Sequence, residues 1–205
     1  MKFRLNDLMH ELKHHLPFTA GATVFAIIIA LILHQYAPSF PQALFEGFHF
    51  VHIVLAAVVS AAMFYRYKTK VLTALLVGMF SSIVFGSVSD VVFPYLGALI
   101  FNLHPEFHMP LIEEPLIILG LGLLGGLLGV IFKVTKIPHF LHVGVSTLAS
   151  MLYLAAYVSE VSIFSVIVSF IVVTLAVVVP CCIGDIILPF FFLGEKIKHC
   201  ECECH

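Results

Sequence analysis

Two pairs of histidines stand near the beginnings of long apolar segments, and their spacing suits metal coordination. His49 and His52 are three residues apart, and His139 and His142 repeat that arrangement. On a helix, this spacing projects both rings from one face. Two imidazoles and a carboxylate from a neighbouring helix suit borderline divalent cations such as Zn²⁺, Mn²⁺ or Fe²⁺. The pattern therefore predicts a site for such an ion, as cargo or as ligand, with no organic cofactor.

Aspartates within apolar segments are the predicted carboxylate ligands. Asp90 is expected to join the first histidine pair and Asp185 the second, with His108 and His15 completing the outer and inner sets. An ionisable group near the centre of a membrane helix costs about 2.5–3.5 kcal/mol on insertion scales, so it usually faces a cavity, a partner or an ion. The principal predicted metal ligands are His49, His52, Asp90, His108, His15, His139, His142 and Asp185.

Further thiol, imidazole and carboxylate groups form a second tier of predicted metal ligands. The chain ends in alternating cysteines flanked by histidines, a tract of soft ligands apt for Zn²⁺ or Cu⁺. An acidic pair near the predicted outer mouth is expected to gather cations. This second tier comprises Glu46, Glu113, Glu114, Cys181, Cys182, His199, Cys200, Cys202, Cys204 and His205.

The elements that position these residues are predicted to be transmembrane helices. Hydrophobic residues make up 61% of the 205 residues and charged residues 11%, whereas a soluble domain has roughly 45–50% and about 25%. A span needs about 20 apolar residues. The sequence predicts an all-α integral membrane protein with six spans, at Pro17–Leu33, Ala43–Tyr65, Val71–Phe101, Leu111–Phe132, His139–Tyr157 and Val161–Leu193.

The basic residues predict the orientation of these spans. All ten Lys and Arg residues lie within 2–13, 66–70, 133–136 or 196–198, and the other three connections contain none. By the positive-inside rule, both termini are expected to be cytoplasmic. We expect a multi-pass protein of a prokaryotic plasma membrane, and the start of the chain predicts no cleavable signal peptide. The net charge of −2 gives no indication of nucleic-acid binding.

The two halves of the chain carry matching motifs in the same order. His15-Leu-Pro matches His108-Met-Pro, His49-Phe-Val-His matches His139-Phe-Leu-His, and Asp90 with a proline four residues later matches Asp185. The offsets are 93, 90 and 95 residues. Because three spans are an odd number, the second copy must be inverted in the membrane, as in many secondary transporters. We predict an amphipathic helix (1–16), two three-helix repeats (17–101 and 102–194) and a metal-binding tail (195–205).

This topology sorts the polar residues into two sets on opposite sides of the membrane. Glu46, His49, His52, Asp90 and His108 are expected toward the outer face, and His15, His139, His142, Cys181 and Asp185 toward the cytoplasm. Pro94 is expected to kink its helix, because it removes a backbone donor four residues after Asp90. The glycine-rich fourth span, with Gly120, Gly122, Gly125, Gly126 and Gly129, suits either internal packing or a homodimer.

The histidine-rich helix openings and the cysteine tract also resemble a known group of proteins. The start HELKHHLPF, the openings HFVH and HFLH, and the tract HCECECH are similar to features of small prokaryotic membrane proteins labelled heavy-metal or manganese exporters. Those proteins are longer, with more spans and a Gly-Cys-Gly motif that this sequence lacks. The resemblance implies a metal as cargo and assigns no individual residue.

We therefore expect a divalent-metal transporter that works by alternating access, with protons as a further expected partner. The alternative is an intramembrane metalloenzyme of the zinc-hydrolase or di-iron type, because Glu46-x-x-His49 resembles a di-iron motif. Two similar ligand sets on opposite faces favour the transporter, since an enzyme normally needs one asymmetric site. A haem-binding electron carrier is a third interpretation, and it requires histidines on facing helices at one depth.

Overall fold

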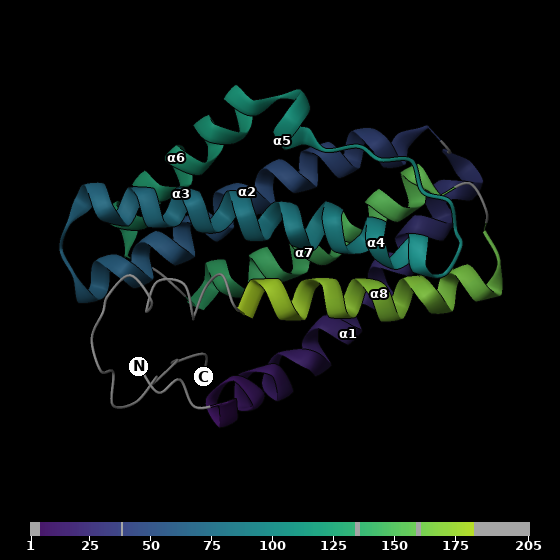
Figure 1. The fold of residues 1–205 in the computed structure, drawn as a ribbon, viewed down its shortest axis with the longest axis horizontal. Helices are drawn as coiled ribbons and strands as arrows, with labels where there is room; N and C mark the ends of the chain where they lie inside the picture. The colour runs from purple at the N-terminus through teal and green to yellow at the C-terminus, as the bar shows by residue number, and fades with distance from the viewer. Residues whose placement is uncertain (1–4, 38, 134–135, 159–160, 183–205) are drawn as a thin grey trace.

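A computed structural model describes residues 5–37, 39–133, 136–158 and 161–182, and for 5–12, 14, 136–140 and 182 the backbone alone. The regular structure in these ranges is helical (Figure 1). The elements are α1 (Leu5–Tyr36), α2 (Phe40–Tyr67), α3 (Val71–Ser87), the π-helix η1 (Val88–Val92), α4 (Phe93–Ile100), α5 (Pro110–Glu113), α6 (Pro115–Phe132), α7 (Lys136–Tyr157) and α8 (Ile163–Cys182).

Five helical stretches in the described part are long and apolar enough to cross a membrane. They are His15–Tyr36, Phe40–Tyr67, Val71–Ile100, Pro115–Phe132 and Ile163–Cys181, and α7 contributes a shorter apolar stretch, Leu141–Tyr157. Large apolar side chains point outward, among them Ile163 at 84% exposure and Leu116 at 83%. Outward-facing apolar surface of this kind indicates an integral membrane protein, because lipid replaces water as the solvent of the helix faces.

The predicted spans overlap described helices, but the fourth, predicted from Leu111 to Phe132, is interrupted because α5 ends at Glu113 and α6 begins at Pro115. The third predicted span corresponds to one continuous helical run, Val71–Ile100, formed by α3, η1 and α4. The described part of the predicted N-terminal helix and the first predicted span form one continuous helix, because α1 begins at Leu5 and continues through Pro17. The sixth begins at Ile163, and its predicted part beyond Cys182 lies outside the described residues.

Each half of the chain packs its first helix against the other half. Among the described helices, α2 and α7 make the most extensive contact and form the centre of the bundle. α1 packs on α7 and α8, whereas α6 packs on α2 and α3. Figure 1 shows the resulting bundle of roughly aligned helices, with α2 and α7 between α6 and α8.

Two glycines of α6 allow this helix to lie against the backbone of α2. A Cβ atom on Gly125 would stand 2.3 Å from the carbonyl oxygen of Val54, and one on Gly129 would stand 2.4 Å from that of Val58. No real side chain fits at such distances, so the small residues permit the close approach of the helices. This part of the glycine-rich face therefore serves internal packing. A homodimer through α6 stays a prediction and would have to use its opposite face.

Side-chain contacts identify which helix ends share one side of the bundle. The amino group of Lys133, just after α6, lies 5.4 Å from the ring centroid of Tyr65, near the end of α2. At the opposite side, the backbone N–H of Glu106 donates to the carbonyl of Tyr157, at the end of α7, over 3.0 Å. The ends of α2 and α6 therefore lie together, and the connection after α4 lies beside the end of α7.

Candidate metal centre

Asp90 lies in a π-helical turn, η1, that directly precedes the turn containing Pro94. Pro94 has no N–H to continue the regular pattern and its ring crowds the preceding turn. The N–H of Phe93 instead donates to the carbonyl of Val88, five residues back. The carbonyl of Ser89 thereby loses its regular partner and accepts the hydroxyl of Ser150 from α7 over 3.0 Å. The kink predicted near Pro94 thus takes the form of a π turn without a helix break, a feature common at functional sites.

The first predicted ligand trio is assembled around one carboxylate oxygen. The Nδ1 atoms of His49 and His52 lie 2.8 Å and 2.7 Å from Oδ2 of Asp90. Each ring can donate an N–H to the ionised carboxylate. None of the three side chains is more than 1% exposed. The two rings share one face of α2, and the juxtaposition with Asp90 that the spacing predicts is present.

The other oxygen of Asp90 is held by two hydroxyl groups. Ser146 of α7 donates to Oδ1 over 2.7 Å, and Ser89 donates to it over 2.9 Å. A buried carboxylate is costly unless its lone pairs are occupied by donors. Four donors from α2, η1 and α7 therefore fix this group in place. No sequence pattern indicated the role of Ser89 and Ser146, although Ser146 follows His142 by one helical turn.

A second trio shares His52 with the first. The rings of His52 and His142 are stacked with centroids 5.7 Å apart and an angle of 4° between their planes. Cys181, a buried reduced cysteine of α8, completes this group. One potential ligand atom from each of the three residues lies within 4.8 Å of the others.

The expected separation of outer and inner ligand sets is therefore wrong for these residues. His52 was assigned to the outer set, and His142 and Cys181 to the inner set, yet the three meet in one buried cluster. The reason is depth along the helices. His52 and His142 are each fifteen residues before the end of their helix, at Tyr67 and Tyr157. Because α2 and α7 cross at this level, both rings reach the middle of the bundle.

His108 forms a different group, at the rim of the bundle. Its Nδ1 lies 2.9 Å from Oε1 of Glu113, and its Nε2 lies 3.8 Å from Oε1 of Glu46. The ring also stacks on Tyr157, with centroids 5.0 Å apart. The exposure of the three side chains is 16% for His108, 49% for Glu113 and 38% for Glu46. The expectation that His108 completes the set of His49 and His52 is therefore wrong.

An aromatic layer separates the rim group from the buried cluster. Phe45 is fully buried and stacks on His49, with centroids 5.7 Å apart. Its ring also meets those of His108, Tyr153 and Tyr157 edge-on, at 6.0, 5.2 and 6.1 Å. Phe45 therefore stands between the two histidine–carboxylate groups.

The remaining predicted ligands have varied positions. His15 is buried on α1, and Glu114 is exposed between α5 and α6. His139 lies in α7 and Cys182 ends α8, but their side chains are not among those described. The other predicted ligands, which are Asp185, His199, Cys200, Cys202, Cys204 and His205, lie outside the described residues.

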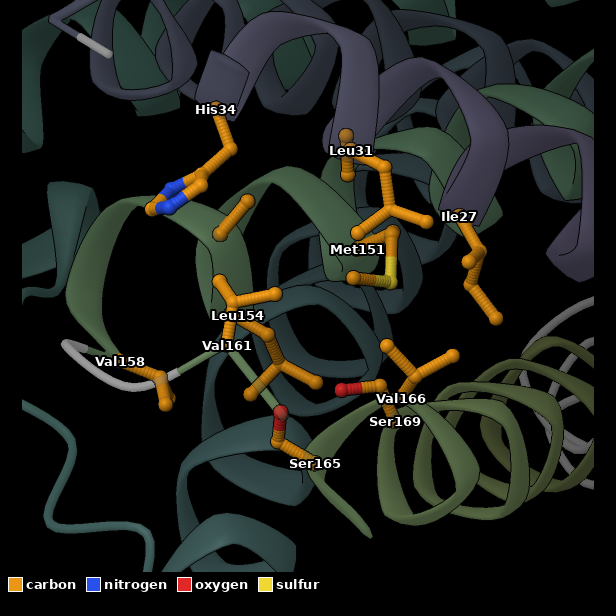
Figure 2. A pocket seen from close by; sticks show the side chains of 12 residues that line it. Ile27, Leu31, His34, Met151, Leu154, Val158, Val161, Ser165, Val166 and Ser169 are labelled. Carbon is orange, nitrogen blue, oxygen red and sulfur yellow. The ribbon is translucent and has the colours of Figure 1, made fainter. Parts of the chain in front are cut away.

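A small cavity between α1, α7 and α8 lies apart from these groups. Figure 2 shows its lining, which is apolar except for His34, Ser165 and Ser169. Its volume is about 40 Å³, whereas pockets for organic ligands measure about 300–1,000 Å³. The cavity therefore has no room for an organic substrate, and none of its described lining residues is a predicted metal ligand.

Comparisons with known proteins add no functional assignment, since no family model, curated protein or solved structure matches this chain. The case for function therefore depends on the geometry of the buried cluster.

Proposed function

We propose that this protein carries a divalent transition-metal cation of the zinc, manganese or iron class across the membrane. The observation that carries the proposal is the complete burial of His49, His52 and Asp90, with their donor atoms directed at one another. Imidazole and carboxylate together are typical ligands of these ions. Titratable residues inside a membrane bundle usually mark an ion or proton pathway.

The distances are compatible with entry of an ion after a small adjustment. The nitrogen-to-oxygen distances are 2.7–2.8 Å, whereas ligands of a tetrahedral ion with bonds of about 2.1 Å stand roughly 3.4 Å apart. An ion between them would therefore require an outward shift of about 0.6 Å on those bond lengths. Alternatively, Asp90 orients the two rings and the metal binds at Nε2, a common arrangement in metalloproteins. Nε2 of His49 is buried and has no hydrogen-bond partner among the described residues, which supports that alternative.

The proposed mechanism is alternating access by six spans in two inverted repeats. Exchanging α1, α2 and α3 with α6, α7 and α8 leaves the set of main helix contacts unchanged, because α1 packs on α7 and α8 as α6 packs on α2 and α3. The stacked pair His52 and His142 maps onto itself, since its members are 90 residues apart, like the HFVH and HFLH motifs. A cation site at the interface of such repeats is open to each side in turn as one repeat rocks against the other.

In this proposal the protein lies in a prokaryotic plasma membrane with both termini in the cytoplasm. All ten Lys and Arg residues lie in the terminal segments and connections predicted to face the cytoplasm. This distribution supports that orientation. His108, Glu113 and Glu46 then stand at the outer mouth of the route, and the cysteine tract stands at the inner side. Protons are proposed as a coupling ion, because imidazoles can release a metal when they take up protons.

An intramembrane metalloenzyme remains the second candidate. One observation favours it: a single buried cluster combines histidines, an aspartate and the hydroxyl of Ser146, as the one asymmetric site of an enzyme would. A haem carrier gains no such support. Although His52 and His142 lie at one level, rings stacked 5.7 Å apart leave no space for a porphyrin between them.

The deciding experiment is metal flux in proteoliposomes loaded with a fluorescent chelator. Wild-type protein should transport Zn²⁺, Mn²⁺ or Fe²⁺, and Asp90→Asn and His52→Gln should abolish the flux. His34→Gln is the matched control, because His34 is exposed and lines the separate apolar cavity. Flux at the wild-type rate in both site variants would refute the assignment. Metal-dependent hydrolysis without flux would support the enzyme.

A further inference from the structure

The described residues contain one thiol that faces the central histidines. Cys181 of α8 is 5% exposed, and its Sγ lies 3.9 Å from Oγ of Ser146, which in turn binds Asp90. The thiol therefore belongs to the same polar cluster as the carboxylate, although it comes from the other half of the chain. A cysteine next to histidines within reach of one ion changes which metals the site prefers.

We propose that the cargo site proper consists of His52, His142 and Cys181, and that it selects thiophilic ions such as Zn²⁺ over Mn²⁺ and Mg²⁺. This inference rests on the proposed function and specifies its substrate class. Potential ligand atoms of the three residues lie within 4.8 Å of one another in a fully buried place. Imidazole and thiolate are both ligand types that bind zinc, and three such ligands leave the fourth position of a tetrahedral site open.

Both carboxylate oxygens of Asp90 accept hydrogen bonds, so we infer that Asp90 orients a metal ligand and does not itself bind the ion. Oδ2 of Asp90 accepts a hydrogen bond from Nδ1 of His52. The other ring nitrogen, Nε2, is then the atom that can bind a metal. Oδ1 of Asp90 is occupied by Ser146 and Ser89. Asp90 is thus a positioning residue that acts on the ion through His52, and Ser146 links it to the side of the cluster where Cys181 lies.

The position of this trio also suits transport better than that of the first one. α2, α7 and α8 each contribute one ligand, so both halves of the chain are represented. An ion there would be released when the halves move relative to each other, because the ligand set cannot stay complete. The trio of His49, His52 and Asp90 comes from the first half alone.

Cobalt spectroscopy on a single-cysteine protein tests this inference. The other four cysteines (Cys182, Cys200, Cys202 and Cys204) are replaced by serine in the full chain, so that the terminal tract cannot mimic the signal. Added Co²⁺ should give the near-ultraviolet band of thiolate-to-cobalt charge transfer, and Cys181→Ser should remove it. We expect Cys181→Ser to weaken Zn²⁺ binding at least about 100-fold and Mn²⁺ binding less than about tenfold.

Asp90→Asn in the same protein separates positioning from coordination. It should weaken Co²⁺ binding about 10- to 100-fold yet keep the charge-transfer band at saturating Co²⁺. Co²⁺ binding without that band, with the Zn²⁺-to-Mn²⁺ preference unchanged in Cys181→Ser, would overturn the inference but leave the proposed transport intact. Failure of the single-cysteine protein and of wild type to bind or transport any of these ions would instead reject the proposed function itself.

Discussion

The molecule holds two groups that each combine imidazole with carboxylate, one buried and one partly exposed. The buried cluster places His49 and His52 against Asp90 with no more than 1% exposure, whereas the rim group places His108 against Glu113 and Glu46 with 16–49% exposure. Exposed ion pairs contribute about 0–1 kcal/mol because water solvates and screens them. A buried group with fixed ligand atoms can instead bind an ion that has lost its hydration shell. Because their exposure differs, we expect the rim group to attract cations weakly and the buried group to bind them selectively.

The ring of Phe45 lies between the two groups. Phe45 contacts His49 on one side and His108 on the other. In the proposed transport route, an ion that passes from the rim to the cluster would have to displace this ring or wait for it to move. Under that proposal the structure would correspond to a state closed on the rim side, since alternating access requires such a barrier on one side at a time.

Replacing one histidine in each group should give the largest contrast. His52→Ala removes a residue shared by both buried trios, so zinc affinity should fall at least about 100-fold. His108→Ala should reduce the affinity less than about tenfold, since solvent can replace its ring. Isothermal titration of purified protein measures both values. Equal losses in the two variants would abolish the proposed distinction between the groups.

Removing the Ser146 hydroxyl should have the next largest effect. Ser146→Ala leaves Oδ1 of Asp90 with one donor fewer, and loss of such a supporting contact typically lowers metal affinity by about tenfold or more. Thr147→Val is the matched control, because Thr147 is equally buried and bonds the carbonyl of Val143 in its own helix. Zinc binding in the two variants should therefore differ. An unchanged affinity in Ser146→Ala would contradict the support role.

Shortening Phe45 should open the path from the rim. In the single-cysteine protein, Phe45→Ala should raise the rate at which a membrane-impermeant thiol reagent labels Cys181 from the rim side several-fold. Phe50→Ala controls for the loss of another ring near His49 on the same helix (centroids 6.5 Å apart), since Phe50 packs against the cluster of Ile53, Ile83 and Ile118. If both variants label at the same rate, Phe45 is not the barrier.

Neutralising the rim carboxylates should have the smallest effect. Glu46→Gln combined with Glu113→Gln should raise the KM for metal about two- to threefold at low ionic strength, because the rim loses its attraction for cations. The difference should shrink at 1 M salt, where charges are screened within about 3 Å. Flux assays at two salt concentrations measure it. A lower kcat with an unchanged KM would show that these acids act inside the route.

The sequence was most informative where local spacing alone decides the outcome. Residues three apart on a helix share a face, so His49 and His52 could be paired without a structure. The cost of an unpaired carboxylate in lipid likewise pointed to a partner for Asp90. His108 could not be placed in the same way, because the segment from Asn102 to Met109 before α5 is not a helix and its path follows no periodicity.

By itself, the sequence determined that the chain crosses a membrane and that Asp90 needs donors from another helix, because both follow from the cost of placing polar groups in lipid. The tertiary structure alone decided that His52, His142 and Cys181 meet. That meeting depends on the depth and rotation of α2, α7 and α8, which are set by how the helices fit together, down to the approach of Gly125 to the backbone of α2. Packing of this kind involves all helices at once, and no local pattern encodes it.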